Sequence, residues 1–407
     1  MPSLRPLASR PRALGPIALP TSGLNLPRTP LHICVVTASF SFTGVALAQV
    51  RFARALSARG HRVDLVFGWV DRNQVPPDFA GLPEIPGVNS ILWDAPRARS
   101  MFGPLRRYLK DAKPDVVFSA EDQLNDMVLL AAIAAGSRAK ISGSSRVFPL
   151  DQPGHDGPYS NQPFTKQWAF KQVTRVAMRR ADVWTCVSDD LATAYRDLFG
   201  SNKFERCYNI IVDKESLERL KEPVDHPWFA DGQTPIVTSA GTLTLRKGFP
   251  DLVRAMRIVH DRGRQVRLAI LGEGPMRGEL EALIRELKLE EWVWLAGRVE
   301  NPLKYFAHSH VSALASYSEG LANVIIESMM AGCVPVATDC PVGPRDALQG
   351  GKYGYLVPMH DPAALAGGII SALDRPISPE LLVEGTRPFE ADAVIDRHFQ
   401  LLGIDGA

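Results

Sequence analysis

The sequence predicts an α/β protein made of two doubly wound domains, each built on a parallel sheet. Short β-branched runs alternate with segments of helical periodicity from Leu31 onward, which is typical of parallel strands joined by crossover helices. A proline-rich polar stretch at 221–235 interrupts this series and is expected to link two domains. The alternation then starts again at Ile236. With 407 residues, the chain has enough material for two cores.

The first series is expected to form a domain over residues 31–220. A strand at "LHICVVTASF", a helix at "GVALAQVRFARALSARGH" and a strand at "RVDLVF" make one βαβ unit. "DVVFSA", "AKISGSS" and "DVWTCVS" continue the strands, with helices between them. The second domain, 236–385, has strands at "IVTSAGT", "VRLAILGEG", "WVWLAGRV", "VSALAS" and "VPVATDC". A last helix at "DAVIDRHFQLLG", within 386–407, is expected to pack back on the first domain.

Composition narrows the class of protein. The five cysteines include no C-x-x-C pair, which indicates reduced thiols in a cytoplasmic protein. No apolar run reaches the roughly 20 residues that a membrane-spanning helix needs. Residues 1–30 contain seven prolines, four arginines and no acid, so we expect a disordered leader there, with a cleaved transit peptide as the alternative.

Charge is distributed unevenly along the chain. The first 220 residues carry 28 Lys+Arg against 20 Asp+Glu, a formal charge of +8, whereas the remainder carries −6. The N-terminal half is therefore expected to face an anionic partner. A predicted helix at "TKQWAFKQVTRVAMRRAD" stacks Lys171, Arg175 and Arg179 at i, i+4 spacing, with Trp168 near its start. A peripheral contact with an anionic membrane is one interpretation, and a solvated face on a core helix is the other. We expect no nucleic-acid partner.

Glycines follow two of the predicted strands. Ligands of open α/β sheets bind beyond the carboxyl ends of strands, so loops at those ends are candidate sites. "TASFSFTG" ends in Gly44, which permits close approach of a ligand or is a simple turn. "ILGEGPMRG" places Gly272 and Gly274 after a strand, but its spacing is one residue longer than the dinucleotide pattern and the ribose-binding acid is missing. We expect a phosphate or sugar there rather than a nicotinamide.

Cations follow two other strands. "GTLTLRKGF" places Arg246 and Lys247 between a strand and a helix, where they suit a diphosphate whose charge grows as it leaves. A solvated basic turn is the alternative. "DCPVGPRDAL" sets Arg345 after a Gly-Pro turn, where its guanidinium can grip a phosphate or a sugar carboxylate.

Two glutamates eight positions apart bracket the start of a predicted helix, "LANVIIESMMAG". Its free N–H groups, at Leu321, Ala322, Asn323 and Val324, form an anion site. Glu319 precedes this end and is at least a favourable partner for the helix dipole. Glu327 lies among apolar neighbours and needs a partner, which two ribose hydroxyls or a salt bridge would provide.

Several metal and cofactor motifs are missing. The sequence contains no Asp-x-Asp triplet, no H-E-x-x-H pattern and no P-loop pattern. We therefore expect neither a bound metal nor another cofactor.

The order of "AGTLTLRKGF", "LGEGP", "AGRV", "SYSEGLANVIIESMMAGCVPVATDCPVGPRD" and "GKYGYLVP" resembles the retaining, nucleotide-sugar-dependent glycosyltransferases of family 4. The resemblance implies a GT-B fold, in which two Rossmann-like domains face each other across a cleft. It places Glu319 near the donor sugar, Glu327 on the ribose and Lys247 on the diphosphate. The remaining residues it assigns to donor binding are Gly320, Leu321 and Ala322 beside the helix start, the amides of Asn323 and Val324 near the phosphates, and Arg298 and Val299 near the base.

This chain departs from the family pattern in two places. Thr242 occupies the position at which family members have an arginine, so Arg246 or Arg345 would have to supply the second phosphate cation. The first domain has no clear match to the family's catalytic-side histidine or aspartate, and Asp122, Arg146 and His155 are the candidates.

The resulting functional prediction is a retaining, metal-independent transfer of a sugar from a nucleotide diphosphate, expected to be UDP, to a hydroxyl. The "DCPVGPRD" loop resembles the subset of the family that builds cell-surface glycans, commonly on lipid-linked acceptors. The protein would then work in the cytoplasm, at the inner face of the membrane. Two alternatives are a nucleotide-sugar epimerase of the same build and a catalytically silent module that only binds a glycan or a protein partner.

Overall fold

The computed structural model describes residues 29–40, 44–72, 81–82, 84–152, 155–156, 158–230, 232 and 234–404. The leader expected at 1–30 lies outside these ranges, except for its last two residues. The described chain divides into two units. One consists of residues 29–210 together with 389–404, and the other of residues 211–388.

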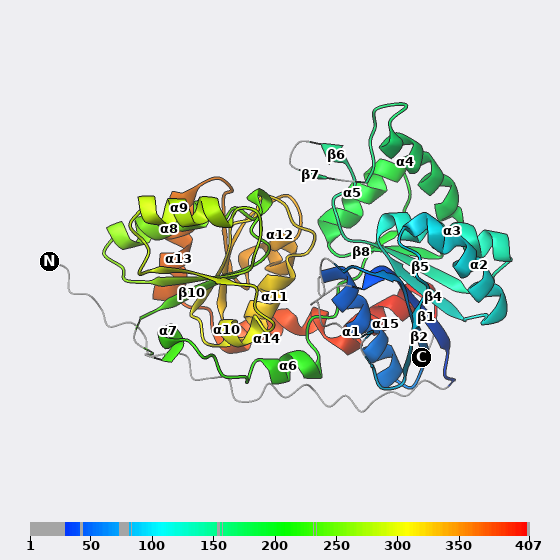
Figure 1. Ribbon diagram of the computed structural model, residues 1–407, viewed down its shortest axis with the longest axis horizontal. Helices are drawn as coiled ribbons and strands as arrows, with labels where there is room; N and C mark the ends of the chain where they lie inside the picture. Colours follow the sequence, from blue (N-terminus) through cyan, green and yellow to red (C-terminus); the bar gives the residue numbers. More distant parts are fainter. Residues whose placement is uncertain are drawn as a thin grey trace. The chain divides into compact units, whose positions relative to one another are not determined.

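The N-terminal unit is a seven-stranded parallel sheet with helices on both faces (Figure 1). In spatial order its strands are β3 (Val88–Leu92), β2 (Arg62–Val70), β1 (His32–Phe40), β4 (Val116–Ala120), β5 (Lys140–Ser145), β8 (Val183–Cys186) and β9 (Phe204–Arg206). Its helices are α1 (Gly44–Ala58), α2 (Phe102–Asp111), α3 (Asp122–Ala135), α4 (Lys166–Ala177), α5 (Asp189–Phe199) and α15 (Ala391–Leu402). A small hairpin pairs β6 (Asp151–Gln152) with β7 (His155–Asp156). The central strands are apolar because both faces of the sheet are covered.

The winding of this sheet reverses between β1 and β4. The chain runs from β1 outward to β2 and β3, and then returns to place β4 on the other side of β1. At such a reversal the helices that follow the two strands go to opposite faces, which leaves a crevice at the carboxyl ends of those strands. The residues that follow β1 and β4 are therefore placed to bind a ligand.

The C-terminal helix α15 packs beside α1 in the same unit (Figure 1). Val394, Ile395 and Phe399 of α15 join the hydrophobic core of the sheet. Arg59, at the end of α1, donates to Asp392 at 2.8 Å and to Asp396 at 2.5 Å, and its own side chain is only 8% exposed. Apolar packing and these ion pairs thus fix the last helix to the first.

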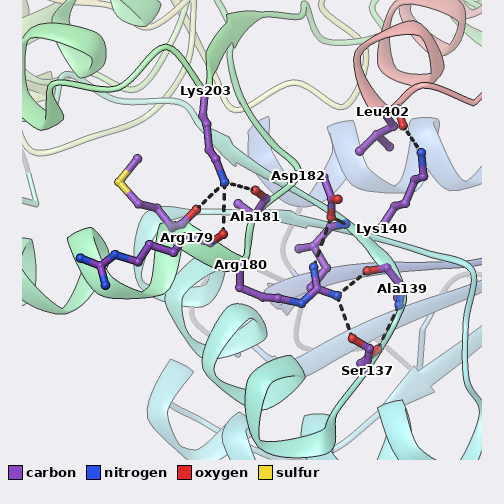
Figure 2. A network of polar contacts seen from close by, with 11 residues as sticks. Ser137, Ala139, Lys140, Arg179, Arg180, Ala181, Asp182, Lys203 and Leu402 are labelled. Carbon is purple, nitrogen blue, oxygen red and sulfur yellow. Dashed lines mark hydrogen bonds and ion pairs between the residues drawn. The ribbon is translucent and has the colours of Figure 1, made fainter.

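Cationic side chains bind the carbonyl groups in and just after the 3₁₀ turn η2 (Met178–Arg180), which follows α4, as Figure 2 shows. Lys203 Nζ donates to the carbonyl oxygens of Met178, Arg179 and Ala181 at 3.1, 3.2 and 2.5 Å. The last carbonyls of a helix lack partners within the helix and lie at the negative end of its dipole, so an ammonium group suits them. Lys140 donates in the same way to the carbonyl oxygen of Leu402 at the end of α15.

The basic face predicted for α4 is only partly present. Lys171 lies on the core side with Thr174 and Ala177, where it is buried and donates to Asn161 Oδ1 at 2.6 Å. The prediction that Lys171 stacks with Arg175 and Arg179 on an exposed face was therefore wrong, because the buried stripe of α4 passes through residue 171. Arg175 and Arg179 are exposed.

A fully buried carboxylate on α3 predicts an unusual pH dependence. Asp126 accepts a hydrogen bond from Thr174 Oγ1 at 2.6 Å, and burial raises its pKa from 3.8 to about 8. Between these values the folded protein holds a proton that the unfolded chain has lost, so this carboxyl lowers stability as the pH rises. Asp126→Asn does not titrate. We expect its melting temperature relative to that of the wild type to increase from pH 5 to pH 8 and then level off. A constant difference across this range would contradict the assignment.

The C-terminal unit is a six-stranded parallel sheet between helices. In spatial order its strands are β12 (Val293–Gly297), β11 (Arg267–Leu271), β10 (Ile236–Ala240), β13 (Val311–Leu314), β14 (Val334–Thr338) and β15 (Tyr355–Val357). Its helices are α6 (Lys214–Arg219), α7 (Pro227–Ala230), α8 (Phe249–Asp261), α9 (Arg277–Glu286), α10 (Leu303–Ala307), α11 (Asn323–Met330), α12 (Pro344–Ala347), α13 (Pro362–Asp374) and α14 (Pro379–Thr386).

The two units join earlier in the sequence than the expected boundary at residue 220. Helix α6 belongs to the C-terminal unit, where Asn301 Nδ2 donates to the carbonyl oxygen of Arg219 at 2.7 Å. The described part of the expected linker, 221–235, is also packed rather than open. It contains α7, and His226 stacks on Trp294 of β12 with ring centroids 3.9 Å apart. Aromatic contacts that were not apparent from local periodicity therefore hold this segment to the sheet.

No helix in the described part of the chain is both long and apolar enough to cross a membrane.

Candidate active site

The candidate site lies where the winding of the C-terminal sheet reverses. The chain runs from β10 outward to β11 and β12, and β13 then returns to the other side of β10. Strands β10 and β13 are parallel, with Val237 opposite Val311, so the loops that follow them meet at one edge. These loops, 241–248 and 315–322, contain three of the charged residues that the sequence singled out, Arg246, Lys247 and Glu319. A crevice at this edge is the expected place for a ligand.

Glu319 and Lys247 form a close ion pair at this edge. Lys247 Nζ lies 2.6 Å from Glu319 Oε1, and the same oxygen accepts a hydrogen bond from Ser316 Oγ at 2.6 Å. The two side chains are 16% and 7% exposed. A carboxylate this deeply buried needs such partners, because an unpaired buried charge is costly. The pairing orients Glu319 and holds Lys247 at the end of β13.

Gly248 allows the two loops to approach each other. It follows the 3₁₀ turn η3 (Leu245–Lys247) and has φ 62°, in the left-handed region that favours glycine. A Cβ atom at this position would lie 1.9 Å from the carbonyl oxygen of Ala315. The backbone of the Lys247 loop therefore rests directly on the segment that follows β13, at a distance that only glycine permits.

Arg246 is the second cation beside Glu319. Its Nη1 donates to the carbonyl oxygen of Ser318 at 2.7 Å and lies 3.9 Å from Glu319 Oε2. Thr242, at the position where the sequence lacks the expected arginine, is exposed in the same loop. Of the two cations considered as substitutes, Arg246 is the one that the structure places next to Glu319 and Lys247.

Arg345 has a different partner. It forms an ion pair with Asp339, with Nε donating at 3.1 Å and a second contact from Nη2. A guanidinium held in this two-pronged way by a carboxylate is less available to a phosphate. Arg345 therefore does not join the Glu319 cluster through any contact in the described residues.

The helix after Glu319 begins two residues later than predicted. Helix α11 spans Asn323–Met330, and Ala322 precedes it with φ 61° and ψ 60°, a left-handed conformation that a helix cannot continue through. Leu321 and Ala322 are buried in the turn. The prediction of helical N–H groups at these two residues was wrong, whereas the amides of Asn323 and Val324 do open the helix. A non-glycine residue in this conformation is often found at ligand sites.

Glu327 lies one turn into α11 and is half-buried. Its neighbours Ile326, Ser328 and Met330 are buried. Gly320 lies in the loop between Glu319 and the helix, and it is half-buried as well. As the sequence predicted, Glu319 precedes the start of α11 and Glu327 lies within the helix.

Gly272 and Gly274, after β11, have a packing role in the protein itself. A Cβ atom at Gly272 would lie 1.9 Å from the carbonyl oxygen of Gly241, and one at Gly274 would lie 2.6 Å from that of Leu243. The Leu243 amide also donates to the carbonyl oxygen of Glu273 at 3.0 Å. Close packing between the loops after β10 and β11 accounts for both glycines without a ligand.

The residues expected near the base follow β12. Arg298 is exposed, and Val299 packs against a hydrophobic cluster that contains Phe229 and Leu271. Strand β12 is at the far edge of the sheet, with β11 between it and β10. These two residues therefore lie in the same unit as Glu319 and follow a strand two places away from β10.

Asp122 and Arg146 come together at the carboxyl ends of β4 and β5 in the N-terminal unit. Asp122 is buried, and its carboxylate accepts hydrogen bonds from Ser145, Tyr159 and Tyr195 at 2.6, 3.1 and 3.0 Å. Burial raises its pKa to about 6. Arg146 donates to Asn209 Oδ1, and burial lowers its pKa to about 10. Asp122 is thus the centre of a hydroxyl network.

The other two first-unit candidates are less informative. Gly44 is exposed at the start of α1, and a side chain there would meet nothing within 4 Å. This space is consistent with a simple turn or with a ligand. The side chain of His155 lies outside the described part of the structure.

Glu121 is a residue that the sequence reasoning missed. It follows β4 with φ 83°, a backbone conformation that residues other than glycine rarely adopt. Burial raises its pKa to about 7, and the nearby Arg146 opposes that rise. A strained, half-buried carboxylate at the carboxyl end of a strand is typical of a functional position. Its place directly after "DVVFSA" was a usable signal.

In chemical terms, the C-terminal unit offers two cations and a helix N-terminus around one buried carboxylate. Helix amides and cations of this kind bind phosphate groups and stabilise charge that develops on a leaving group. In the described residues, no cluster of three or more His, Cys, Asp and Glu side chains has the geometry of a metal site.

Comparison with known proteins matches this chain to two glycosyltransferase families. Residues 42–214 match the family described as Glycosyltransferase Family 4, and residues 234–375 match Glycosyl transferases group 1. Together these two regions include more than half of the 407 residues.

Two curated relatives are informative. The chain is 39% identical over 139 residues to the N-acetylgalactosamine-N,N'-diacetylbacillosaminyl-diphospho-undecaprenol 4-alpha-N-acetylgalactosaminyltransferase of Campylobacter jejuni, a match that covers 34% of this chain. It is 27% identical over 307 residues to the lipopolysaccharide core biosynthesis glycosyltransferase LpsD of Rhizobium meliloti, covering 73% of this chain. The matches span 37% and 77% of these two relatives, and 64% of a glycosyltransferase of Methanocaldococcus jannaschii that the chain also resembles.

A solved structure shows the same fold. The crystal structure of Anabaena Alr3699/HepE in complex with UDP aligns with a TM-score of 0.68, over 92% of this chain and 100% of that one, at 16% identity. The fold class predicted from the sequence, two parallel-sheet α/β domains of the GT-B type, is confirmed. From its two family matches, its fold and the order of its motifs, this chain belongs to the family 4 (group 1) glycosyltransferases.

Proposed function

We propose that this protein transfers a sugar from a UDP-sugar to a hydroxyl of a glycan or lipid-linked acceptor, with retention at the anomeric carbon and without a metal ion. The observation that carries the proposal is the ion pair between Lys247 and Glu319 at the reversal point of the C-terminal sheet. It places a cation, a sugar-orienting carboxylate and the start of α11 close together at the carboxyl ends of the central strands. These three features suit a nucleotide sugar, because cations and helix amides bind its diphosphate and a carboxylate accepts hydrogen bonds from its sugar hydroxyls.

Each group has a defined part in the proposed reaction. The diphosphate gains negative charge as the bond to the sugar breaks, and Lys247, Arg246 and the amides of Asn323 and Val324 offset that charge. Glu319 accepts hydrogen bonds from the sugar hydroxyls and so fixes the anomeric carbon relative to the acceptor. Two cations beside the phosphates do electrostatically what a divalent ion does in metal-dependent enzymes, which supports a metal-free reaction.

The acceptor is inferred from the relatives. The Campylobacter jejuni relative is named for a sugar on diphospho-undecaprenol, and the Rhizobium meliloti relative for lipopolysaccharide core biosynthesis. We extend this chemistry to the present chain as synthesis of a cell-surface polysaccharide. A peripheral contact with an anionic membrane would use the exposed residues of α4 and its flanks, which include Phe164, Val173, Arg175 and Val176.

A nucleotide panel tests the donor. UDP, GDP and ADP and their glucose derivatives are added separately, and the melting temperature is recorded. A ligand at 100 times its Kd stabilises by about 2.7 kcal/mol, which shifts the melting temperature by several degrees. The largest shift is expected with UDP compounds. No shift with any nucleotide would favour the silent binding module.

Product analysis tests the reaction. The donor that binds best is incubated with and without an acceptor in the presence of EDTA, and the anomeric proton of the product is followed by NMR. We expect transfer with the donor's own anomeric configuration and no effect of EDTA. Epimerised sugar or free UDP in the absence of acceptor would favour the epimerase. An inverted product or a requirement for metal would contradict the corresponding part of the proposal.

The ribose contact predicts the effect of Glu327→Gln. Losing a charged hydrogen-bonded contact should weaken UDP binding by about 1–3 kcal/mol, roughly 5- to 150-fold in Kd. Titration calorimetry with UDP measures this directly. Glu279→Gln, an exposed glutamate in the first turn of α9, removes the same charge from the same unit and should leave the Kd unchanged. Equal affinities of the two variants for UDP would show that Glu327 does not bind the ribose.

A further inference from the structure

An open cavity lies at the amino edge of the sheet in the N-terminal unit. It has a volume of about 770 Å³, a size typical of small-molecule sites, and its lining includes Leu31 before β1, Asp115 before β4 and Ala139 before β5. Ile404, after α15, adds to the lining. The carboxyl ends of these strands are about 15 Å away, because β4 has five residues. The cavity is therefore separate from the candidate residues that follow the strands, and the proposed sugar transfer makes no use of it.

The described lining residues of this cavity include four cations and a single acid. Lys110 and Lys113 come from the end of α2 and the turn after it, and Arg138 comes from the turn between α3 and β5. All three are exposed, and in the parts of the chain that the structure describes none of them forms an ion pair. The acid, Asp115, accepts a hydrogen bond from the His32 amide at 2.8 Å. A concave surface with this excess of positive charge attracts an anion.

The turn that carries Arg138 is held by cations on both of its sides, as Figure 2 shows. Arg180 Nη2 donates to the carbonyl oxygens of Ser137 and Ala139 at 2.9 and 2.7 Å. Lys140, the fourth cation of the lining, donates to carbonyl oxygens at the end of α15. This wall of the cavity is therefore fixed by the protein's own contacts, and a ligand loses little binding free energy in ordering it.

Apolar side chains form much of the remaining lining. Leu109 and Val116 are buried, and Leu31 and Ile404 are half-buried. A bare inorganic anion would contact the cations and leave these side chains unused. An anion that carries an alkyl chain would use both parts of the lining, because the chain would cover apolar surface while the charged group stays with the cations.

The geometry points to this cavity as a binding site for an amphiphilic phosphate, with its phosphate group on Lys110, Lys113 and Arg138 and its alkyl part on the apolar lining. The inference does not depend on the proposed sugar transfer. It provides a place for the anionic partner that the formal charge of +8 on the first 220 residues predicts. The headgroup of an anionic membrane lipid and a soluble alkyl phosphate offer the same chemistry to these cations, so the test has to distinguish the two sources.

The test compares two triple variants of the full chain with the wild type. The cavity variant is Lys110→Gln, Lys113→Gln, Arg138→Gln. The control is Arg62→Gln, Arg72→Gln, Arg107→Gln, which removes the same charge from exposed positions of the same unit outside the cavity. Because all six side chains are exposed, both variants should keep the melting temperature of the wild type.

Two measurements are made on these three proteins. Octyl phosphate below its critical micelle concentration, inorganic phosphate and neutral octanol are titrated by calorimetry at low and at moderate salt. Sedimentation then measures binding to vesicles of phosphatidylcholine alone and of phosphatidylcholine mixed with phosphatidylglycerol. Anion binding at any other site of the protein, including the proposed diphosphate site, is the same in the control and in the cavity variant, so the difference between them reports on the cavity.

The wild type and the control are expected to bind octyl phosphate at least about tenfold more tightly than octanol or inorganic phosphate, and more weakly at higher salt. The cavity variant should lose at least about tenfold of that affinity. A loss of binding to the phosphatidylglycerol vesicles in the cavity variant alone assigns a membrane lipid as the source of the phosphate. Equal vesicle binding by all three proteins assigns a soluble amphiphile.

Three results overturn the inference. The first is an equal affinity of the cavity variant and the control for octyl phosphate, and the second is a wild type that does not prefer octyl phosphate to octanol. The third is inorganic phosphate that binds as tightly as octyl phosphate, because the apolar lining would then have no part in the site.

Discussion

Replacing Lys247 by methionine is expected to lower kcat/KM for sugar transfer at least about 100-fold. Removing one preorganised group that stabilises developing charge typically costs 10²- to 10³-fold in rate. Methionine retains most of the lysine chain but cannot donate to Glu319 or to a phosphate. Initial rates of UDP release at a fixed acceptor concentration measure the effect.

A second variant separates catalysis from folding. Lys247→Met alone leaves the buried Glu319 carboxylate with Ser316 as its nearest donor, at a cost of about 1–3 kcal/mol in the free energy of unfolding. The double variant Lys247→Met, Glu319→Gln also removes the buried negative charge, and should recover most of that stability. It should not recover activity. Recovery of activity together with stability would mean that the ion pair only maintains the fold.

Gly248→Ala is expected to disturb the site by moving a whole loop. The added Cβ would lie 1.9 Å from the carbonyl oxygen of Ala315, so the Lys247 loop must move away from the end of β13. We expect the free energy of unfolding to fall by at least about 3 kcal/mol, from the clash added to the strain of alanine at φ 62°. The kcat/KM value should fall at least tenfold, because Lys247 moves with the loop.

Gly263→Ala is the matched control. Gly263 also has a left-handed φ, 77°, but a Cβ atom there meets nothing within 4 Å. Both changes restrict the unfolded chain equally and place alanine in a strained conformation, so their difference isolates the clash with Ala315. The control should lose about 1 kcal/mol and keep its activity. Equal losses in the two variants, by urea denaturation and by rate, would rule out the close loop contact as the determinant of the site.

Local sequence patterns predicted most of the framework. Strands buried on both faces are continuous apolar runs, and the helices between them repeat at 3.6 residues, so both elements are visible within a short window. The placing of Lys247 and Glu319 at strand ends followed from the same patterns. The contact between the two side chains could not be predicted in this way, because it depends on the pairing of β10 with β13, whose facing residues are 74 positions apart.

The remaining differences have physical causes beyond sequence periodicity. Ala322 adopts a left-handed conformation that alanine does not favour, so α11 begins only at Asn323. The prediction for Lys171 failed because its neighbours across α4 are core residues and Asn161 supplies a buried partner. The sequence did not show which of Arg246 and Arg345 lies beside Glu319, because only the fold brings Asp339 to Arg345. In each case a tertiary contact decided between two locally acceptable outcomes.

A crystal structure of the UDP complex tests the central claim most directly. The account predicts diphosphate oxygens within about 3 Å of Lys247 Nζ and of the Asn323 and Val324 amides, with both ribose hydroxyls on Glu327. It would be contradicted by a nucleotide bound at another edge of the C-terminal sheet while Lys247 keeps Glu319 as its partner.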